Sequence, residues 1–352
     1  NMAEQLCDGF CALEQIKTIA VVGNTTMCHI FLGQDISGLA GSPFRPAYRG
    51  IYRCKGSDID LQEMKDTDVI VPAGIDAHVG ADAVSMICAL QLQETKETVL
   101  AVDIGTNAEI ALSCKGEISV CSAPAGPAFE GAQISQGMRG EPGAIAGMHI
   151  ARQSGNILLE VIPDDKRNVY PVRGICGSGL IDSIASLRQS DILQPDGYLL
   201  CDPEEADRLG IPGYLRERIT EKGFLVYLDP GGQQVCLTQK DIRQFQLAKA
   251  AVQAGIRMLL EQKGLALQQV DRIYIAGVFG GHISKKSAVL TGLFPDIAPE
   301  KLVIAGNAAG EGAARALLSE VFLRQTEQVG TEAAHIELAQ QEAFQQEFLA
   351  SM

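Results

Sequence analysis

The chain has 352 residues, 46% apolar and 20% charged, which is long enough for two lobes with separate cores. Its formal net charge of −14 argues against nucleic acid or an anionic membrane surface as a partner, because both are polyanions. No apolar run approaches the roughly 20 residues that span a bilayer. The ten cysteines include no Cys-x2-Cys pair, which is typical of reduced thiols in a cytoplasmic protein.

Short apolar runs alternate with helical patterns, which predicts an α/β fold. In residues 1–96, strands are expected at 19–22 and 69–71, each followed by a helix. Thr25 or Thr26 is expected to cap the first helix, and the second ends near residue 90. Residues 33–68 are expected to form loop with little regular structure. The polar segment 91–98 marks the boundary between lobes.

Residues 97–327 are expected to form a second lobe, with an insertion at about 194–237, and residues 328–352 a polar helical tail. Thr238 is expected to cap a long amphipathic helix that Gly264 ends, because apolar residues recur there at three-, four- and seven-residue spacings. The other expected elements, in order, are strands at 99–104, 108–113 and 117–122, a glycine-rich loop at 123–147, a polar hairpin within 149–172, a helix at 177–193, a hairpin near 231–232, strands at 273–276 and 302–305, and a helix to residue 318.

Two stretches share a rhythm of strand, helix, strand, helix: one begins at residue 19, the other at residue 273. The second is preceded by three hairpin-type strands, the first by only 18 residues. The first lobe is therefore expected to be incomplete and the chain to be part of a longer protein. Chance similarity is the alternative, because a strand, a glycine and a helix commonly follow one another.

The strand at 99–104 carries the first candidate site. Asp103 lies at the end of a buried strand, where an unpaired carboxylate is costly, so it is a candidate catalytic residue and Mg²⁺ ligand. Gly105, Thr106 and Asn107 follow it and could turn backbone amides and a hydroxyl toward a phosphate. The alternative is an aspartate satisfied by the amides of a turn.

Glycines punctuate two further candidate sites. Gly177, Ser178 and Gly179 open a helix, where backbone N–H groups favour an anion, although tight packing also requires small residues. The run 276–281 (Ala-Gly-Val-Phe-Gly-Gly) ends a strand and leaves room for a flat base, with helix–strand packing as the alternative. Its candidate nucleotide contacts are Ala276, Gly277, Gly280 and Gly281, and Gly306 and Asn307 follow the next strand.

Acidic residues outside the strands are further candidates, and Glu130 is the second candidate catalytic residue. Glu130 lies in the glycine-rich loop and could orient water or a metal, or simply face solvent. Asp76, His78 and Asp82 could suggest a metal, but their spacing is typical of a turn entering a helix, with Asp82 in the first turn.

Together these runs resemble the actin-like (ASKHA) superfamily of two ribonuclease-H-like lobes, and within it the reductive activators of corrinoid proteins. The resemblance covers about 19–310. The matching runs are 22–27 (Val-Gly-Asn-Thr-Thr-Met) with 29–33 (His-Ile-Phe-Leu-Gly), 79–82 (Val-Gly-Ala-Asp), 102–107 (Val-Asp-Ile-Gly-Thr-Asn), 125–132 (Ala-Gly-Pro-Ala-Phe-Glu-Gly-Ala), 137–139 (Gly-Met-Arg), 173–182 (Arg-Gly-Ile-Cys-Gly-Ser-Gly-Leu-Ile-Asp) and 276–281.

The resemblance implies Mg²⁺-ATP in a cleft between the lobes, with 103–107 at the phosphates, 276–281 at the adenosine, and 72–86 and 306–313 as connecting helices. It implies ATP-driven electron transfer from a [2Fe–2S] cluster to cob(II)amide of a partner corrinoid protein. The N-terminal cluster domain and an earlier Asp-Ile-Gly-Thr turn of the family are not in this sequence, so the cluster is expected only in the full-length protein. A small-molecule kinase and a nucleotide-regulated interaction module are the alternatives, and the exposed partial lobe could pair with a second copy.

Overall fold

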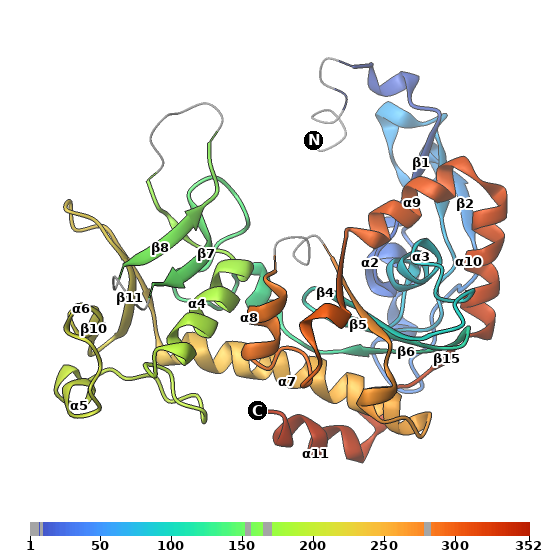
Figure 1. Cartoon of the computed structure of the whole chain (residues 1–352). Helices are drawn as coiled ribbons and strands as arrows, with labels where there is room; N and C mark the ends of the chain where they lie inside the picture. The colour runs from blue at the N-terminus through green and yellow to red at the C-terminus, as the bar shows by residue number, and fades with distance from the viewer. Residues whose placement is uncertain (1–6, 8–9, 152–155, 165–170, 278–282) are drawn as a thin grey trace.

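A six-stranded sheet organises the structure, a computed structural model that describes residues 7, 10–151, 156–164, 171–277 and 283–352 (Figure 1). The strand order is β14-β13-β4-β5-β6-β15. Strands β4, β5 and β6 are antiparallel neighbours, as expected, whereas β13 and β14 run parallel to β4. The strands are β4 (Thr98–Ile104), β5 (Ala108–Cys114), β6 (Glu117–Ala123), β13 (Arg272–Ala276), β14 (Leu302–Gly306) and β15 (Ala334–His335).

Helices cover both faces of this sheet. Leu100 and Val102 of β4 belong to the core under α7 (Gln239–Gln262), whereas Val99 and Ala101 belong to the core shared with α3 (Ala81–Ala89) and α9 (Ala308–Leu318). Successive residues of a strand face opposite sides of the sheet. A strand that is covered on both faces, such as β4, therefore has apolar residues at consecutive positions. Among the described residues, none of the helices combines the length and apolar character needed to cross a membrane.

The predicted cap of α7 is confirmed. The Thr238 hydroxyl accepts a hydrogen bond from the Asp241 backbone N–H, and the Asp241 carboxylate accepts one from the Thr238 N–H at 2.8 Å. This reciprocal arrangement satisfies donors that the first turn of a helix otherwise leaves unpaired. Gly264 follows the helix with φ +63°, the left-handed conformation typical of a helix end.

The N-terminal part contains a three-stranded sheet in the order β1-β3-β2. Its elements are β1 (Thr18–Ala20), α2 (Thr25–Phe31), β2 (Tyr52–Lys55) and β3 (Asp68–Val71). The loop expected over 33–68 is wrong in part, because β2 pairs with β3. The expected cap at Thr25 or Thr26 is also wrong: the Asn24 side chain accepts the hydrogen bond from the Met27 N–H at 2.9 Å.

The repeated rhythm of strand, helix, strand and helix corresponds to two similar units. Strands β1 and β3 are parallel neighbours joined through α2, and β13 and β14 are parallel neighbours joined through α8 (Lys285–Leu290). The final helices of the units, α3 and α9, pack against each other. A Cβ added to Gly312 would lie 2.5 Å from the Ser85 carbonyl oxygen, so only glycine permits this approach.

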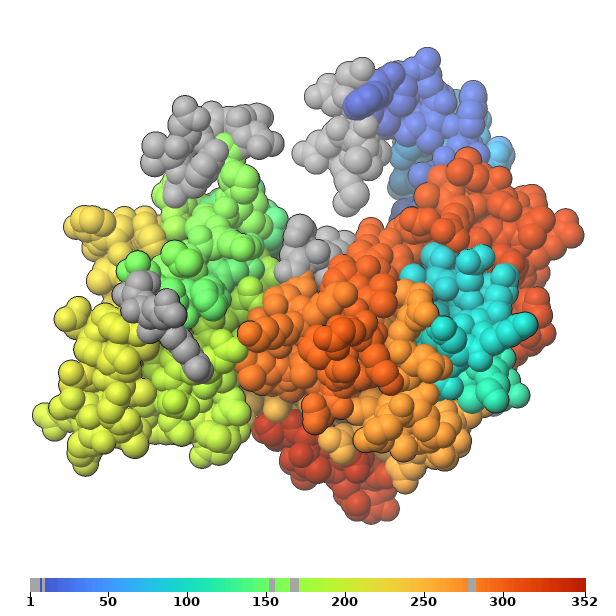
Figure 2. All heavy atoms as spheres, in the orientation of Figure 1, coloured from blue at the N-terminus to red at the C-terminus, as the bar shows by residue number. Residues whose placement is uncertain are grey.

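The elements between residues 144 and 237 lie beside the six-stranded sheet and share its core under α7. Figure 2 shows the surface hollowed between this green-to-yellow part and the blue N-terminal part. The expected hairpin begins at residue 144, inside the segment expected to be loop, and α4 ends at residue 189 rather than near 193. The predicted hairpin near 231–232 is confirmed as β11–β12. The elements are β7 (Ala144–Ile150), β8 (Ile157–Val161), β9 (Gly174–Ile175), α4 (Gly177–Gln189), α5 (Pro203–Arg208), α6 (Gly213–Arg216), β10 (Ile219–Thr220), β11 (Gly223–Leu228) and β12 (Gln234–Leu237).

The C-terminal segment differs from the expected helical tail. Helix α10 (Glu320–Glu332) runs across the expected boundary at 327, β15 then pairs with β6, and α11 (Glu342–Ala350) packs against α7. Residues 328–352 are therefore attached to the second lobe through a strand and a helix face. Figure 1 shows α11 beneath α7.

Candidate functional site

The carboxyl ends of three parallel strands meet at one edge of the six-stranded sheet. Ala276 of β13 is paired with Asp103 of β4 on one side and with Gly306 of β14 on the other. The two strand ends that the sequence singled out, at 103–107 and from 276, are therefore neighbours. Of the predicted contacts in this second segment, Gly280 and Gly281 lie outside the described residues. The carboxyl edge of parallel strands is the usual place for a ligand in α/β folds.

Gly277 lies directly against Asp103. Its φ of +96° is a conformation that favours glycine, and an added Cβ would lie 2.6 Å from the Asp103 Oδ1. Glycine at this position therefore follows from both the backbone conformation and the space available. It lets the end of β13 approach the carboxylate that ends β4.

The turn after β4 is held by three hydrogen bonds. The Gly105 N–H donates to the Asn107 carbonyl at 3.0 Å, and the Gly126 N–H donates to the Thr106 carbonyl at 2.8 Å. The Thr106 hydroxyl donates to Glu130 Oε1 at 2.6 Å. Glu130 ends the short 3-10 helix η5 (Pro127–Glu130), so the structure brings this predicted acid to the turn from another loop.

Three carboxylates gather around the end of β4. Asp103 directly opposes Glu109 of β5 in the antiparallel register, and Asp82 in the first turn of α3 is close enough to interact with both. Burial raises the pKa of Asp82 to about 6, and burial together with Asp82 raises the pKa of Asp103 to about 6. Burial, Asp82 and Asp103 raise the pKa of Glu109 well above its usual value. None of the ion pairs within the described residues involves these three carboxylates, so no paired cation neutralises the charge that they gather.

This donor set fits a hydrated Mg²⁺ ion. Mg²⁺ prefers carboxylate, water and phosphate oxygens and usually takes only one or two carboxylates from the protein. Asp103 supplies such an oxygen at the strand end. Within the described residues, no group of three or more His, Cys, Asp or Glu side chains forms a cage that could hold a metal by itself. The remaining ligands would have to come from phosphate and water.

Sequence reasoning missed the contribution of Asp82 and Glu109. Glu109 could have been found, because a tight hairpin turn at 105–107 places residues 103 and 109 opposite each other. Asp82 was recognised only as a first-turn acid of a helix. Its interaction with Asp103 joins the first turn of α3 to the end of β4, which are 21 positions apart in the sequence, and no local pattern signals that.

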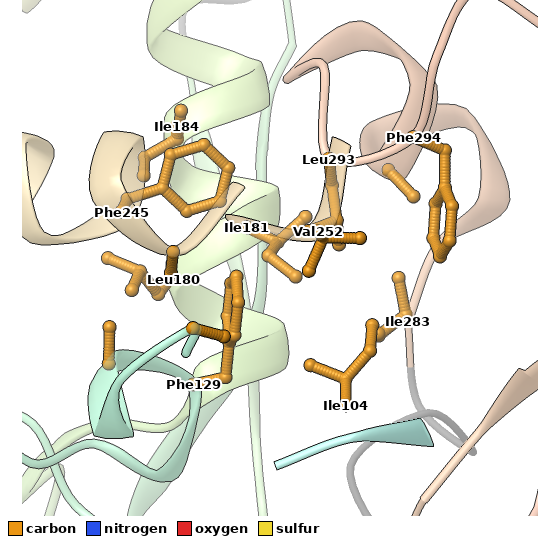
Figure 3. Packing of buried hydrophobic residues seen from close by; sticks show 14 of the residues in the cluster. Ile104, Phe129, Leu180, Ile181, Ile184, Phe245, Val252, Ile283, Leu293 and Phe294 are labelled. Carbon is orange, nitrogen blue, oxygen red and sulfur yellow. The ribbon is translucent and has the colours of Figure 1, made fainter. Parts of the chain in front are cut away.

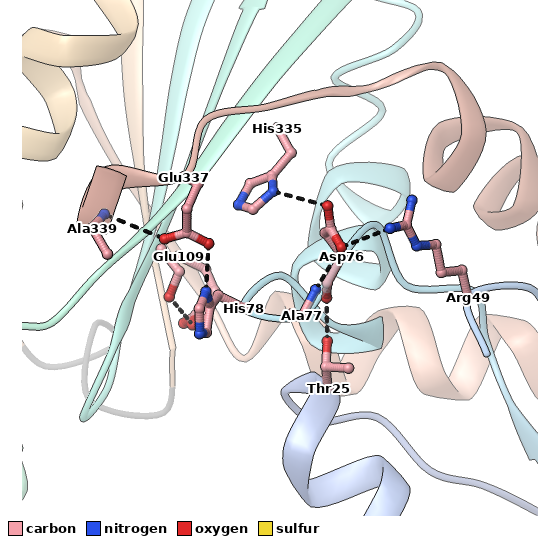
Figure 4. A network of polar contacts seen from close by, with 10 residues as sticks. Thr25, Arg49, Asp76, Ala77, His78, Glu109, His335, Glu337 and Ala339 are labelled. Atoms are coloured by element: carbon pink, nitrogen blue, oxygen red, sulfur yellow. Dashed lines mark hydrogen bonds and ion pairs between the residues drawn. The ribbon is translucent and has the colours of Figure 1, made fainter. Parts of the chain in front are cut away.

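The turn at 74–80 forms a polar network rather than a metal site (Figure 4). His78 Nδ1 lies 2.6 Å from Glu337 Oε2, and Asp76 accepts from Arg49 at 2.9 Å. His335 Nδ1 lies 3.4 Å from the second Asp76 oxygen. This network fastens the N-terminal part to the segment around β15.

The start of α4 is buried. Gly177, Ser178 and Gly179 are all buried, and a Cβ on Gly179 would lie 2.1 Å from the Ile145 carbonyl oxygen. Tight packing of α4 on β7 therefore explains the glycine at 179, and a nucleotide contact at 177–179 stays a prediction. The next turns of α4 carry Leu180, Ile181 and Ile184 into the core shared with Phe129 (Figure 3).

Gly306 and Asn307 lie where β14 passes into α9. Gly306 has φ +62°, and the Asn307 side chain caps the helix by accepting from the Gly310 N–H at 2.9 Å. Both residues therefore have a structural role at this turn. Their place beside the ends of β4 and β13 is the observation that favours a nucleotide role as well.

The paired strand–helix units, the hairpin sheet between them and the glycine turns at one edge define an actin-like (ASKHA) domain. Comparison with known proteins agrees with this class. Residues 97–352 match the family described as the C-terminal domain of RACo, the ASKHA domain, and residues 1–95 match the RACo middle region. The chain therefore belongs to the RACo family, the reductive activators of corrinoid proteins.

Similar proteins carry names of the same kind. The chain is 33% identical to the corrinoid activation enzyme RamQ of Eubacterium limosum over 93% of its length and 54% of the relative's. It is 27% identical to a [Co(II) methylated amine-specific corrinoid protein] reductase of Methanosarcina barkeri, over 97% of its length and 63% of the relative's. A solved structure of a reductive activator for a corrinoid, iron-sulfur protein superposes with a TM-score of 0.87 at 32% identity, covering 99% of this chain and 54% of that one. The chain thus spans little more than half the length of these proteins.

Proposed function

We propose that this chain is the nucleotide-binding part of an ATP-dependent reductive activator that converts cob(II)amide to cob(I)amide in a partner corrinoid protein. The observation that carries the proposal is the meeting of Asp103 and Gly277 at adjacent strand ends. Membership of the RACo family supplies the reaction class. In that reaction one electron passes to cobalt from a [2Fe–2S] cluster, which belongs to the full-length protein.

The residues at the sheet edge divide into distinct roles. Asp103 would hold Mg²⁺, and the turn at 105–107 would receive the phosphates through backbone N–H groups and the Thr106 hydroxyl. Glu130 accepts a hydrogen bond from that hydroxyl and would orient the attacking water. Catalysis by such a site depends on positioned charge around metal and phosphate, without a covalent intermediate. We propose that the remaining parts of the nucleotide are contacted by Gly177, Ser178, Gly179, Ala276, Gly277, Gly280, Gly281, Gly306 and Asn307.

The two lobes would meet the nucleotide from both sides. We propose residues 1–96 as the remainder of the first ribonuclease-H-like lobe and 97–327, with its insertion, as the second. Residues 328–352 are assigned to the second lobe, because β15 and α11 pack against it. Helices α3 and α9 would connect the lobes. We further propose a cytoplasmic location and pairing with a second copy of the chain.

Calorimetric titration of the chain with Mg²⁺-ATP tests the proposed site. We expect saturable binding to the unaltered protein and loss of at least about tenfold in affinity, or about 1.4 kcal/mol, in Asp103→Ala. Glu300→Ala, at an exposed position in the short 3-10 helix η8 (Pro299–Lys301), serves as the control and should bind normally. Unchanged binding by Asp103→Ala would refute the assignment.

The corrinoid reaction is tested separately in the full-length protein. Asp103→Ala should abolish ATP-dependent formation of cob(I)amide, followed by its absorption spectrum, while the [2Fe–2S] spectrum stays unchanged. A phosphorylated metabolite formed by the unaltered protein, with no cobalt reduction, would instead favour the small-molecule kinase. Capture of a corrinoid protein regardless of nucleotide, without turnover, would favour the interaction module.

A further inference from the structure

A second pocket lies away from the sheet edge that carries the candidate nucleotide site. It has a volume of about 320 Å³ and is bounded by the C-terminal half of α4, the middle of α7 and the segment 289–296 that ends and follows α8. Helix α8 begins at Lys285, and this pocket lies at the other end of the helix, around residues 289–292. It is therefore distinct from the edge formed by β4, β13 and β14.

Two cations in this pocket have no acidic partner among the described residues. Arg188 of α4 and Lys249 of α7 both line it, and neither forms an ion pair or a side-chain hydrogen bond within the part of the chain that the structure describes. Burial, and then the neighbouring Arg188 charge, lowers the pKa of Lys249. Two adjacent unneutralised cations are unexpected in a chain whose net charge is −14.

Helix geometry explains one of these cations but not the other. Arg188 lies in the last turn of α4, where a positive charge interacts favourably with the helix dipole. Lys249 lies in the interior of α7, far from either end of that helix. Its half-buried ammonium group therefore costs free energy in the unliganded protein, and a bound anion would remove that cost.

The remaining lining suits a ligand with an apolar body. Ile184, Phe245 and Phe294 supply an apolar wall, and Figure 3 shows the first two facing each other across the α4–α7 contact. Gln194 and Gln246 add amide groups. Asp296 is the carboxylate of the lining, and it is exposed and forms no ion pair with either cation among the described residues.

We propose that this pocket binds a small organic anion, with a phosphate or carboxylate group placed between Arg188 and Lys249 and a compact apolar body against Phe245. An anion held by two cations in a partly desolvated pocket gains charge-assisted hydrogen bonds, which are stronger than neutral ones. Pockets of this kind commonly combine an apolar wall with a few polar groups that fix the ligand's orientation. The proposal does not depend on the nucleotide site.

Phenyl phosphate and benzoate are suitable probes, because each joins one anionic group to a small apolar ring. We expect calorimetry on the 352-residue chain at low salt to give saturable binding of at least one of them. Lys249→Met and Arg188→Gln should each weaken it by roughly tenfold, equivalent to about 1.4 kcal/mol. Lys240→Gln removes an exposed charge near the start of the same helix α7 and is the matched control, with unchanged affinity expected.

Two further measurements keep the test decisive. Asp103→Asn should leave probe binding unchanged, and Mg²⁺-ADP should not compete with the probe. If Lys249→Met fails to fold by circular dichroism, Arg188→Gln on α4 still provides the comparison. Absence of saturable binding up to about 10 mM, the weak end of specific affinities, would overturn the proposal. Equal weakening by Lys240→Gln, or displacement by Mg²⁺-ADP, would overturn it as well.

Discussion

Replacing Asp103 with asparagine should separate stability from function at the sheet edge. The pKa of Asp103 is about 6 in the folded protein against an ordinary value of 3.8, chiefly because of burial and then because of Asp82. A folded-state pKa raised by this amount means that ionisation destabilises the fold, by at most about 3 kcal/mol. Because Asp103 keeps some contact with solvent, we expect Asp103→Asn to raise the free energy of unfolding by about 1–3 kcal/mol at pH 7.5.

The sign of the pH dependence follows from the same shift. Between about pH 3.8 and pH 6 the folded protein binds more protons at Asp103 than the unfolded chain does, so stability falls as pH rises through this window. Below the window both states are protonated and the penalty is absent. The stabilisation by Asp103→Asn should therefore be small near pH 4, growing through the window and complete above about pH 7.

Urea denaturation of the nucleotide-free protein with a chelator present measures this effect. Circular dichroism is the appropriate probe, because the chain has no tryptophan. Glu300→Gln at an exposed position is the control and should leave the free energy of unfolding unchanged at pH 4 and at pH 7.5. Equal stability of Asp103→Asn and the unaltered protein at pH 7.5, or a difference that does not grow with pH, would refute the reasoning. Added Mg²⁺-ATP should reverse the order by stabilising only the unaltered protein.

Three further substitutions test the packing that positions the site. Gly277→Ala places a Cβ 2.6 Å from the Asp103 Oδ1, so we expect weaker Mg²⁺-ATP binding by calorimetry; normal affinity would show that this approach is not required. Gly312→Ala forces a Cβ to 2.5 Å from the Ser85 carbonyl and should cost about 1–3 kcal/mol in urea denaturation, against no change for Gly41→Ala, where the added Cβ meets open space. Asp241→Ala removes hydrogen bonds from the Thr238 and Ser135 N–H groups at 2.8 and 2.6 Å, and this single variant should lower the free energy of unfolding by about 1–3 kcal/mol in urea denaturation. A loss within experimental error would mean that water replaces these bonds.

Local chemistry was enough to predict much of the fold. The apolar run before Asp103 and the glycine turn after it predicted β4 and its hairpin, and the Thr238 cap predicted the start of α7. These features depend on residues within a few positions of one another, so the sequence displays them directly. The resemblance to corrinoid activators depended on the order of several such runs.

Short strands with distant partners were not predictable in this way. The four residues of β2 alternate between half-buried and exposed positions and form a strand only through β3, and the two residues of β15 depend on β6. So short a segment has little conformational preference of its own. Its pairing therefore depends on a neighbour supplied by the rest of the fold.

The candidate site, like the fold, was predictable from the sequence only in part. The sequence by itself determined that Asp103 ends a buried strand and that glycines follow the parallel strands. Only the tertiary structure brought Asp82 from α3 and Glu130 from η5 to that strand end. Burial there raises the pKa of Asp82, and burial together with Asp82 raises the pKa of Asp103. Electrostatic interaction depends on distance in space and on local exclusion of water, and neither is a property of sequence separation.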